Sequence, residues 1–122
     1  MTPAERKAAY LELEKKYRPY LGLEGIPYLE EGTRWQYQMH IYETPFYYID
    51  YCLAQVTALQ FLLLSLKDYD DAFARYFKLL STGGEKFFTE LLAEAGLRSP
   101  FEEGSLSGVA REMEALITSI RV

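Results

Sequence analysis

The segment HIYETPFYYIDYCLAQ, residues 40–55, gathers the side chains of this chain that could do chemistry. It begins with the only histidine, His40, and continues through a Thr-Pro pair to three tyrosines and an aspartate. Phenol and imidazole groups can donate hydrogen bonds to a carbonyl oxygen on which negative charge develops. The same aromatic residues can simply pack, because each buries a large ring and needs one partner for its polar tip. The residue types alone favour packing.

Helical spacing would bring these tyrosines together. Tyr48 and Tyr51 are three residues apart and share a helix face, while Tyr47 shares its face with Tyr51 at a spacing of four. This geometry requires a helix from Pro45 to about Leu66, which is apolar nearly all round. A helix of that kind is expected at the centre of a structure.

Other catalytic sites find little support in the sequence. A zinc hydrolase often carries two ligands in an H-E-x-x-H helix, which a chain with one histidine cannot form. Cys52 lies in the apolar helix without a basic neighbour in sequence, so inert packing is expected. Solvated caps explain the acidic pairs Glu30-Glu31, Asp70-Asp71 and Glu102-Glu103. The sequence therefore predicts neither a metal site nor a cofactor in this chain.

The remaining pattern predicts an all-α fold, a single domain over residues 1–122. Thr2-Pro3-Ala4-Glu5 has the form of a capping box with proline at the first helical position. We expect an irregular bundle of five to seven helices around the long central apolar helix at about 45–66. The flanking helices are expected at about 3–18, at 33–42, from Asp70 or Asp71 to Gly83-Gly84, at 86–95, and along a last stripe from Val109 to Ile120.

Composition excludes several classes of protein. The chain has a formal net charge of −5 and a pI near 4.9, and no run of Lys and Arg forms a stripe, so nucleic-acid binding is not expected. The single Cys52 excludes an intramolecular disulfide, and no secretory signal opens the sequence. A reducing, cytoplasmic location fits these features best.

The apolar stretch from Phe46 to Leu66 has the length of a membrane span. It carries Asp50, Gln55 and Gln60, and three strongly polar side chains near the centre of a span would be costly in lipid. We therefore expect a buried helix of a soluble protein and no membrane partner.

Two stretches closely resemble a known family. These are GTRWQYQMHIYETPFYYIDYCLAQVTALQF and, further on, FTELLAEAGLRSPFEEGSL. They are similar to the C-terminal end of oligoendopeptidase F, in the thimet-oligopeptidase-like group of zinc metallopeptidases, and the resemblance covers most of the chain. Members are several times longer, act on oligopeptides, and bind zinc through an H-E-x-x-H helix and a further glutamate upstream of the matched region. The resemblance implies that those ligands lie outside this chain.

The resemblance also implies roles for the opening segment. In the family, the histidine and following tyrosines line the cleft opposite the zinc and bind the scissile carbonyl as it becomes an oxyanion. Carried over by position, these roles fall on His40, Tyr48 and Tyr51, with Tyr47 as a substitute for Tyr48 and Tyr42 as a weaker substrate-binding candidate.

Two hypotheses follow for the function of the chain. The first is a C-terminal part of an oligoendopeptidase F-type peptidase that is inactive without the metal-binding part. The second is a stand-alone helical protein that uses the same fold for association or peptide binding. Apolar surface left uncovered by the rest of the chain would favour the first hypothesis. Apolar surface fully covered by the chain's own helices would favour the second. Because the short helices are too small to cover the central one, we also expect self-association, as a two-fold dimer.

Overall fold

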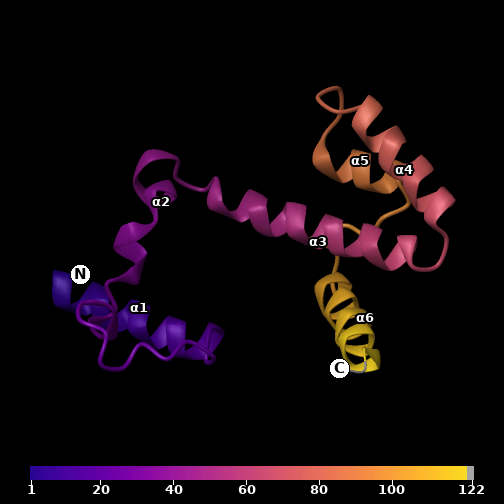
Figure 1. The fold of residues 1–122 in the computed structure, drawn as a ribbon. Coiled ribbons are helices and arrows are strands. Elements are labelled where there is room, and N and C mark those ends of the chain that lie inside the picture. The colour runs from indigo at the N-terminus through magenta and orange to yellow at the C-terminus, as the bar shows by residue number, and fades with distance from the viewer. Residues whose placement is uncertain (121–122) are drawn as a thin grey trace. The chain divides into compact units, whose positions relative to one another are not determined.

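The computed structural model describes residues 1–120, and these are predominantly helical (Figure 1). It contains six α-helices, two short 3-10 helices and, within the described residues, no strand. This confirms the predicted all-α class and the predicted number of helices. In chain order the elements are α1 (Pro3–Tyr17), η1 (Leu29–Glu31), η2 (Arg34–Tyr37), α2 (Met39–Glu43), α3 (Tyr48–Ser65), α4 (Tyr69–Ser81), α5 (Phe88–Glu94) and α6 (Ser105–Ser119).

The chain divides into two compact units, Met1–Tyr48 and Ile49–Val122. The first contains α1, η1, η2 and α2, and the second contains almost all of α3 together with α4, α5 and α6. The single-domain organisation stays a prediction.

Helix α1 begins with the predicted capping box. The backbone N–H of Thr2 donates to Glu5 Oε2 at 2.6 Å, and the N–H of Glu5 donates to Thr2 Oγ1 at 3.3 Å. Pro3 has no backbone N–H, so the helix start has three orphan donors, and the capping box satisfies two of them. The apolar residues that follow do not form a buried face, because Leu13 is 52% exposed and Tyr17 66% exposed.

A carboxylate instead lies on the buried side of α1. Glu14 is 5% exposed and accepts a hydrogen bond from Arg34 Nη1, on η2, at 3.3 Å. Among the described residues its second oxygen, Oε2, has no hydrogen-bond partner. Burial raises the pKa of the nearby Tyr10 phenol, and the Glu14 carboxylate raises it further. A partly buried ion pair, in which Glu14 is the buried partner, therefore joins α1 to η2.

In the second unit, α3 is much less covered than predicted. Gln60 is its only buried residue among those described, so the expectation of a helix buried within this chain is wrong. Cys52, expected in inert packing, is exposed. The physical reason is size: the core of this unit is small and contacts only the second half of α3. Leu92, Ala95 and Leu97 form it, with Phe61, Leu64, Leu79 and Phe88 packed against them.

Gln60 attaches α3 to the loop that follows α5. Its Nε2 donates to the backbone carbonyl of Arg98 at 3.0 Å, and the Arg98 N–H donates to Gln60 Oε1 at 2.9 Å. The side-chain amide thus satisfies both backbone groups of one residue, as a neighbouring strand would. The Arg98 side chain continues the connection to α6 by donating to Glu112 at 2.7 Å.

We expect Gln60→Leu to lower the free energy of unfolding of this unit by about 2 kcal/mol, because it leaves a donor and an acceptor of Arg98 unpaired. Gln55→Leu is the matched control, since Gln55 lies on the same helix and is exposed; its effect should stay within about 0.5 kcal/mol. Urea unfolding followed by circular dichroism measures both. Equal midpoints for the two variants would contradict the structural role of Gln60.

The N-terminus of α4 differs from the sequence prediction. Asp68, rather than Asp70 or Asp71, is the N-cap residue, and its Oδ1 accepts from the Asp71 N–H at 3.1 Å. Asp68 has the extended backbone that an N-cap needs, whereas the other two aspartates already lie in the first turn. Sequence alone does not distinguish three aspartates so close together.

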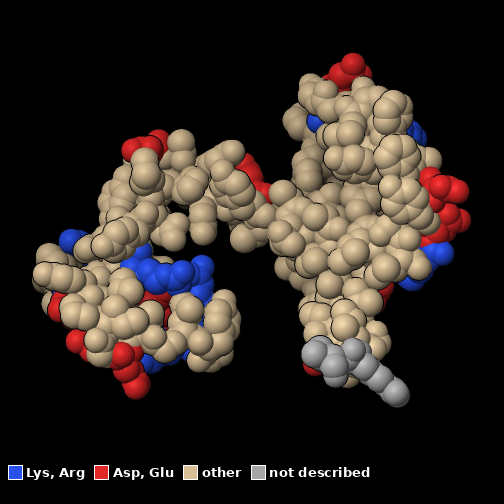
Figure 2. Space-filling view, viewed as in Figure 1, with Lys and Arg blue, Asp and Glu red and all other residues tan. Residues whose placement is uncertain are grey.

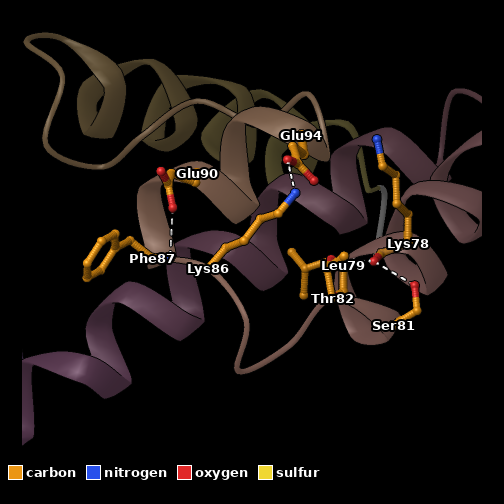
Figure 3. Close-up of polar contacts among 8 residues, drawn as sticks. All are labelled: Lys78, Leu79, Ser81, Thr82, Lys86, Phe87, Glu90 and Glu94. Atoms are coloured by element: carbon orange, nitrogen blue, oxygen red, sulfur yellow. Dashed lines mark hydrogen bonds and ion pairs between the residues drawn. The ribbon is translucent and has the colours of Figure 1, made fainter.

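Charged side chains make contacts at both ends of α5 (Figure 3). The backbone N–H of Phe87 donates to Glu90 Oε2 at 2.9 Å, which closes the start of the helix. At its end, Lys86 pairs with Glu94. The Lys86 ammonium holds the pKa of the Glu94 carboxyl below its usual range, while the same contact raises the pKa of Lys86. Both groups are exposed, so we assign this pair little stabilising effect.

By length and composition alone, α3 could cross a membrane. Its 18 residues have a mean hydropathy of 1.2, and 6% of them are buried. Core helices of soluble proteins meet the same criteria, and the buried, hydrogen-bonded Gln60 would be costly in lipid. The expected absence of a membrane partner stays a prediction.

Candidate functional site

A tight turn between α2 and α3 builds the segment that holds the histidine and the tyrosines. Helix α2 ends at Glu43, and the Tyr47 N–H then donates to the Thr44 carbonyl at 3.2 Å. Pro45 occupies the second position of this turn, and Phe46 occupies the third with a φ of 71°. Proline followed by a positive φ is the pattern of a type II turn.

This turn corrects the predicted start of the long helix. Pro45 was expected to begin a helix, but the fixed φ of proline suits the second position of a turn equally well. The left-handed backbone of Phe46 then prevents the helix from starting before Tyr48. Tyr47 therefore lies in the turn and not on a helix face shared with Tyr51. The helix predicted at 33–42 is likewise divided, into η2 and α2.

The turn brings the aromatic side chains on either side of it together. The ring centroids of His40 and Tyr48 are 5.1 Å apart with an interplanar angle of 45°, and those of His40 and Tyr47 are 6.1 Å apart at 23°. Tyr47 and Tyr48 are 47% and 43% exposed. His40, Tyr47 and Tyr48 thus lie close together in the first unit, and their roles at a site stay a prediction.

Tyr51 is one helical turn beyond Tyr48 on α3 and belongs to the second unit. Its side chain is 54% exposed. A spacing of three residues puts Tyr48 and Tyr51 on the same face of α3, as predicted for this pair. Phenols on one helix face can donate hydrogen bonds to one acceptor.

Tyr42, the weaker candidate, lies in a second aromatic group. Its ring stacks on Trp35 at a centroid distance of 6.1 Å, and Trp35 in turn contacts Tyr10 of α1 at 6.5 Å. These contacts hold the five-residue helix α2, which has no side-chain N-cap, against the rest of its unit. Trp35 and Tyr10 therefore contact the segment that carries His40, and the sequence analysis did not single them out.

The described residues do not fit a zinc site. Within residues 1–120 no three His, Cys, Asp or Glu side chains are grouped so that they could hold a metal ion. The Glu14 carboxylate has an orphaned oxygen, but its other oxygen pairs with Arg34. A structural or catalytic zinc needs three or four converging ligands. The phenol and imidazole groups of this segment can donate hydrogen bonds.

Comparison with known proteins gives one consistent result. No family model and no curated protein matches the chain. A crystal structure of an oligoendopeptidase F matches 98% of this chain with 45% sequence identity and a TM-score of 0.90. A structure of PZ peptidase A with an inhibitor matches 98% of it with 48% identity and a TM-score of 0.89.

The match is nearly complete for this chain and partial for the relatives. The chain spans 21% of the length of each of these two proteins. At 45–48% identity, similarity of fold and similarity of sequence point to the same relationship. Together with the helices described above, they show that this chain belongs to the oligoendopeptidase F family.

Proposed function

We propose that this chain supplies the carbonyl-binding side of an active site that cleaves oligopeptides. The observation that carries the proposal is the contact of His40 with Tyr47 and Tyr48 beside the first turn of α3, in a chain that matches two peptidases. Half-exposed phenols at a helix start can reach a bound peptide.

In this proposal, Tyr48 and Tyr51 donate hydrogen bonds to the oxygen of the scissile carbonyl. Both bonds strengthen as that oxygen gains negative charge, so they stabilise the transition state more than the bound substrate. His40 orients Tyr48 or donates beside it, and Tyr47 and Tyr42 contact the peptide. The exposure of Tyr47, Tyr48 and Tyr51 supports these roles.

We place the zinc expected for the full-length family on residues outside this chain. The described residues lack a suitable ligand group, and no role proposed for His40 or the tyrosines depends on binding a metal. The isolated chain should therefore not cleave peptides. The exposed apolar face of α3 supports a part of a larger peptidase over a stand-alone helical protein, which would be expected to close that surface.

A chimera tests the proposal. In it, this sequence replaces the matched fifth of PZ peptidase A, with the remaining sequence of that protein unchanged. We expect the chimera to cleave a fluorogenic oligopeptide and the isolated chain to leave it intact. A chimera that is folded and carries its full metal content, yet does not cleave the peptide, would overturn the proposed function.

A further inference from the structure

A cavity of about 530 Å³ lies within the first unit. Its lining comes from residues 26–29, which include Tyr28, and from Arg34, Tyr37 and Gln38 of η2 and its C-cap. All of these residues precede Tyr48, so the walls belong to the first unit alone. Ligand pockets for small molecules usually measure about 300–1,000 Å³, so this cavity has room for one.

The loop that forms one wall of the cavity is fixed by contacts within the first unit. The buried Thr33 hydroxyl donates to the Tyr28 carbonyl. Glu31, three residues after Tyr28, pairs with Lys7 of α1 at 2.7 Å. The wall is therefore formed before a ligand binds, which reduces the entropy that binding costs.

Tyr28 is held in an unfavourable backbone conformation. Its φ of 67° and ψ of −43° lie outside the regions that residues with a side chain normally occupy. The ring gains little from packing in this chain, since Tyr28 is 72% exposed. Backbone strain of this kind recurs at ligand-binding sites. A contact between the Tyr28 ring and a ligand would give the side chain a role that glycine could not supply.

Arg34 brings a positive charge to the cavity. Its side chain is 32% exposed, and its Nη1 donates to Glu14 Oε1 at 3.3 Å. A guanidinium group has five N–H donors, and this is the only hydrogen bond described for the Arg34 side chain within residues 1–120. The buried Glu14 thus anchors the guanidinium group, and donors remain for a second carboxylate.

The charges around Arg34 favour an anion. Burial raises the pKa of the Tyr10 phenol and the Glu14 carboxylate raises it further, whereas the Arg18 and Arg34 guanidinium groups lower it. Two cations and one buried carboxylate therefore act on the same phenol. Figure 2 shows Lys and Arg side chains gathered over α1 in this unit.

The acidic residues nearest to the cavity in sequence are Glu30 and Glu31 of η1. Neither lines it. Glu30 Oε2 accepts from the Gly25 N–H at 3.0 Å, and Glu31 is paired with Lys7. Both carboxylates therefore have partners other than Arg34.

We propose that this cavity binds a carboxylate that is carried beside an aromatic or aliphatic group. Arg34 donates to the carboxylate through two parallel N–H groups, the geometry that guanidinium groups form with carboxylates. The Tyr28 and Tyr37 rings flank the apolar group. Two sources share this chemistry, namely the C-terminus of a peptide and an acidic side chain next to an apolar one. The inference goes beyond the proposed function, since it requires no role for His40 or the tyrosines beside it.

Small carboxylates test the cavity in the isolated chain and in the chimera. N-acetylphenylalanine is titrated into each by isothermal titration calorimetry, and so is its amide, which keeps the ring and loses the charge. We expect the amide to bind at least about 10-fold more weakly, because it loses the charge-assisted hydrogen bonds to Arg34. N-acetylglutamyl-phenylalanine amide carries its carboxylate on a side chain instead, and the tighter of the two acids identifies the source.

Tyr28→Gly separates binding from stability. Glycine adopts the backbone conformation of Tyr28 without strain, so the melting temperature should stay unchanged or rise. N-acetylphenylalanine should nevertheless bind at least about 10-fold more weakly, because one aromatic wall is lost. Tyr20→Ser is the matched control, because Tyr20 is 78% exposed in the same unit and does not line this cavity. It should bind like the unchanged chain.

Arg34→Lys tests the guanidinium group. Lysine keeps a positive charge for Glu14 but lacks the planar fork that binds a carboxylate through two N–H groups. We therefore expect weaker binding of N-acetylphenylalanine and unchanged binding of its amide.

Several results would overturn the inference. These are no measurable binding of either acid, equal affinity for N-acetylphenylalanine and its amide, and unchanged binding by the Tyr28→Gly or Arg34→Lys chain. Binding by the isolated chain but not by a folded chimera would show that the rest of the peptidase fills the cavity, which also contradicts it. The proposed function is judged separately, by peptide cleavage. A chimera that binds N-acetylphenylalanine without cleaving its oligopeptide supports the cavity and contradicts the function, whereas one that cleaves without binding does the reverse.

Discussion

The chimera carrying both Tyr48→Phe and Tyr51→Phe is expected to cleave its oligopeptide with a kcat lowered by roughly 10²–10³. This is the usual effect of removing one preorganised donor to a developing oxyanion, and two donors that act together are not additive. Phenylalanine keeps the ring and the helix while removing only the hydroxyl group. KM should change less than kcat, because the hydrogen bonds are stronger in the transition state than in the substrate complex.

The alternative hypothesis, that the two tyrosines only pack, predicts an almost unchanged kcat. If Tyr48 and Tyr51 only pack, loss of their hydroxyl groups changes stability by about 1 kcal/mol each and leaves turnover almost unaffected. Tyr17→Phe is the matched control, since Tyr17 is 66% exposed and has no ring contact with His40 among those described. Unchanged kcat in the double variant, at unchanged metal content and melting temperature, would assign the two tyrosines to packing.

Combining His40→Gln with Tyr48→Phe tests whether His40 acts through Tyr48. Tyr48 contacts His40, whereas Tyr51 lies one turn further along α3. If His40 orients Tyr48, then His40→Gln should reduce kcat in the unchanged chimera and have much less effect when Tyr48 is already phenylalanine. This non-additivity would distinguish a positioning role from independent donation.

Local sequence signals predicted the parts of this fold that depend on local interactions. The capping box of Thr2 and Glu5 forms as expected because both partners lie within one helical turn. Tyr48 and Tyr51 share one face of α3 because this helix is continuous from Tyr48. The all-α class follows from the same helical periodicity.

The features that the sequence did not predict depend on distant partners or on unusual backbone geometry. Glu14 is buried because Arg34, twenty residues away, reaches it from η2. Phe46 adopts a positive φ, which residue type gives no reason to expect. The exposure of α3 depends on how many other segments pack against it. A local sequence pattern does not predict that number.

Gly32→Ala is expected to destabilise the first unit by about 3–4 kcal/mol. A Cβ at this position would lie 2.3 Å from the backbone oxygen of Lys7 and 3.0 Å from Leu11 Cβ, both on α1. The backbone oxygen cannot move without displacing the helix. In addition, Gly32 has a φ of 79°, which costs roughly 1–2 kcal/mol for a residue with a side chain. Glycine is therefore required here both by conformation and by contact.

Gly25→Ala separates these two causes. Gly25 has a similar φ of 74°, but a Cβ there would meet nothing within 4 Å. Its variant should lose only the conformational part, about 1–2 kcal/mol. Trp35 is the only tryptophan and contacts Tyr10 on α1, so its fluorescence reports unfolding of this unit in urea. Coincident unfolding curves for the two variants would show that the approach of Gly32 to α1 has no energetic role.

The same close approach affects the candidate site. Gly32 ends η1, and the chain continues directly through η2, whose Arg34 pairs with Glu14 and whose Trp35 contacts α1 and Tyr42. Displacing Gly32 from α1 would loosen these contacts and, through Tyr42, the short helix that carries His40. In the chimera, Gly32→Ala should therefore lower kcat as well as stability, whereas Gly25→Ala should leave kcat unchanged. Loss of stability without loss of activity in the Gly32 variant would show that α2 is held independently of α1.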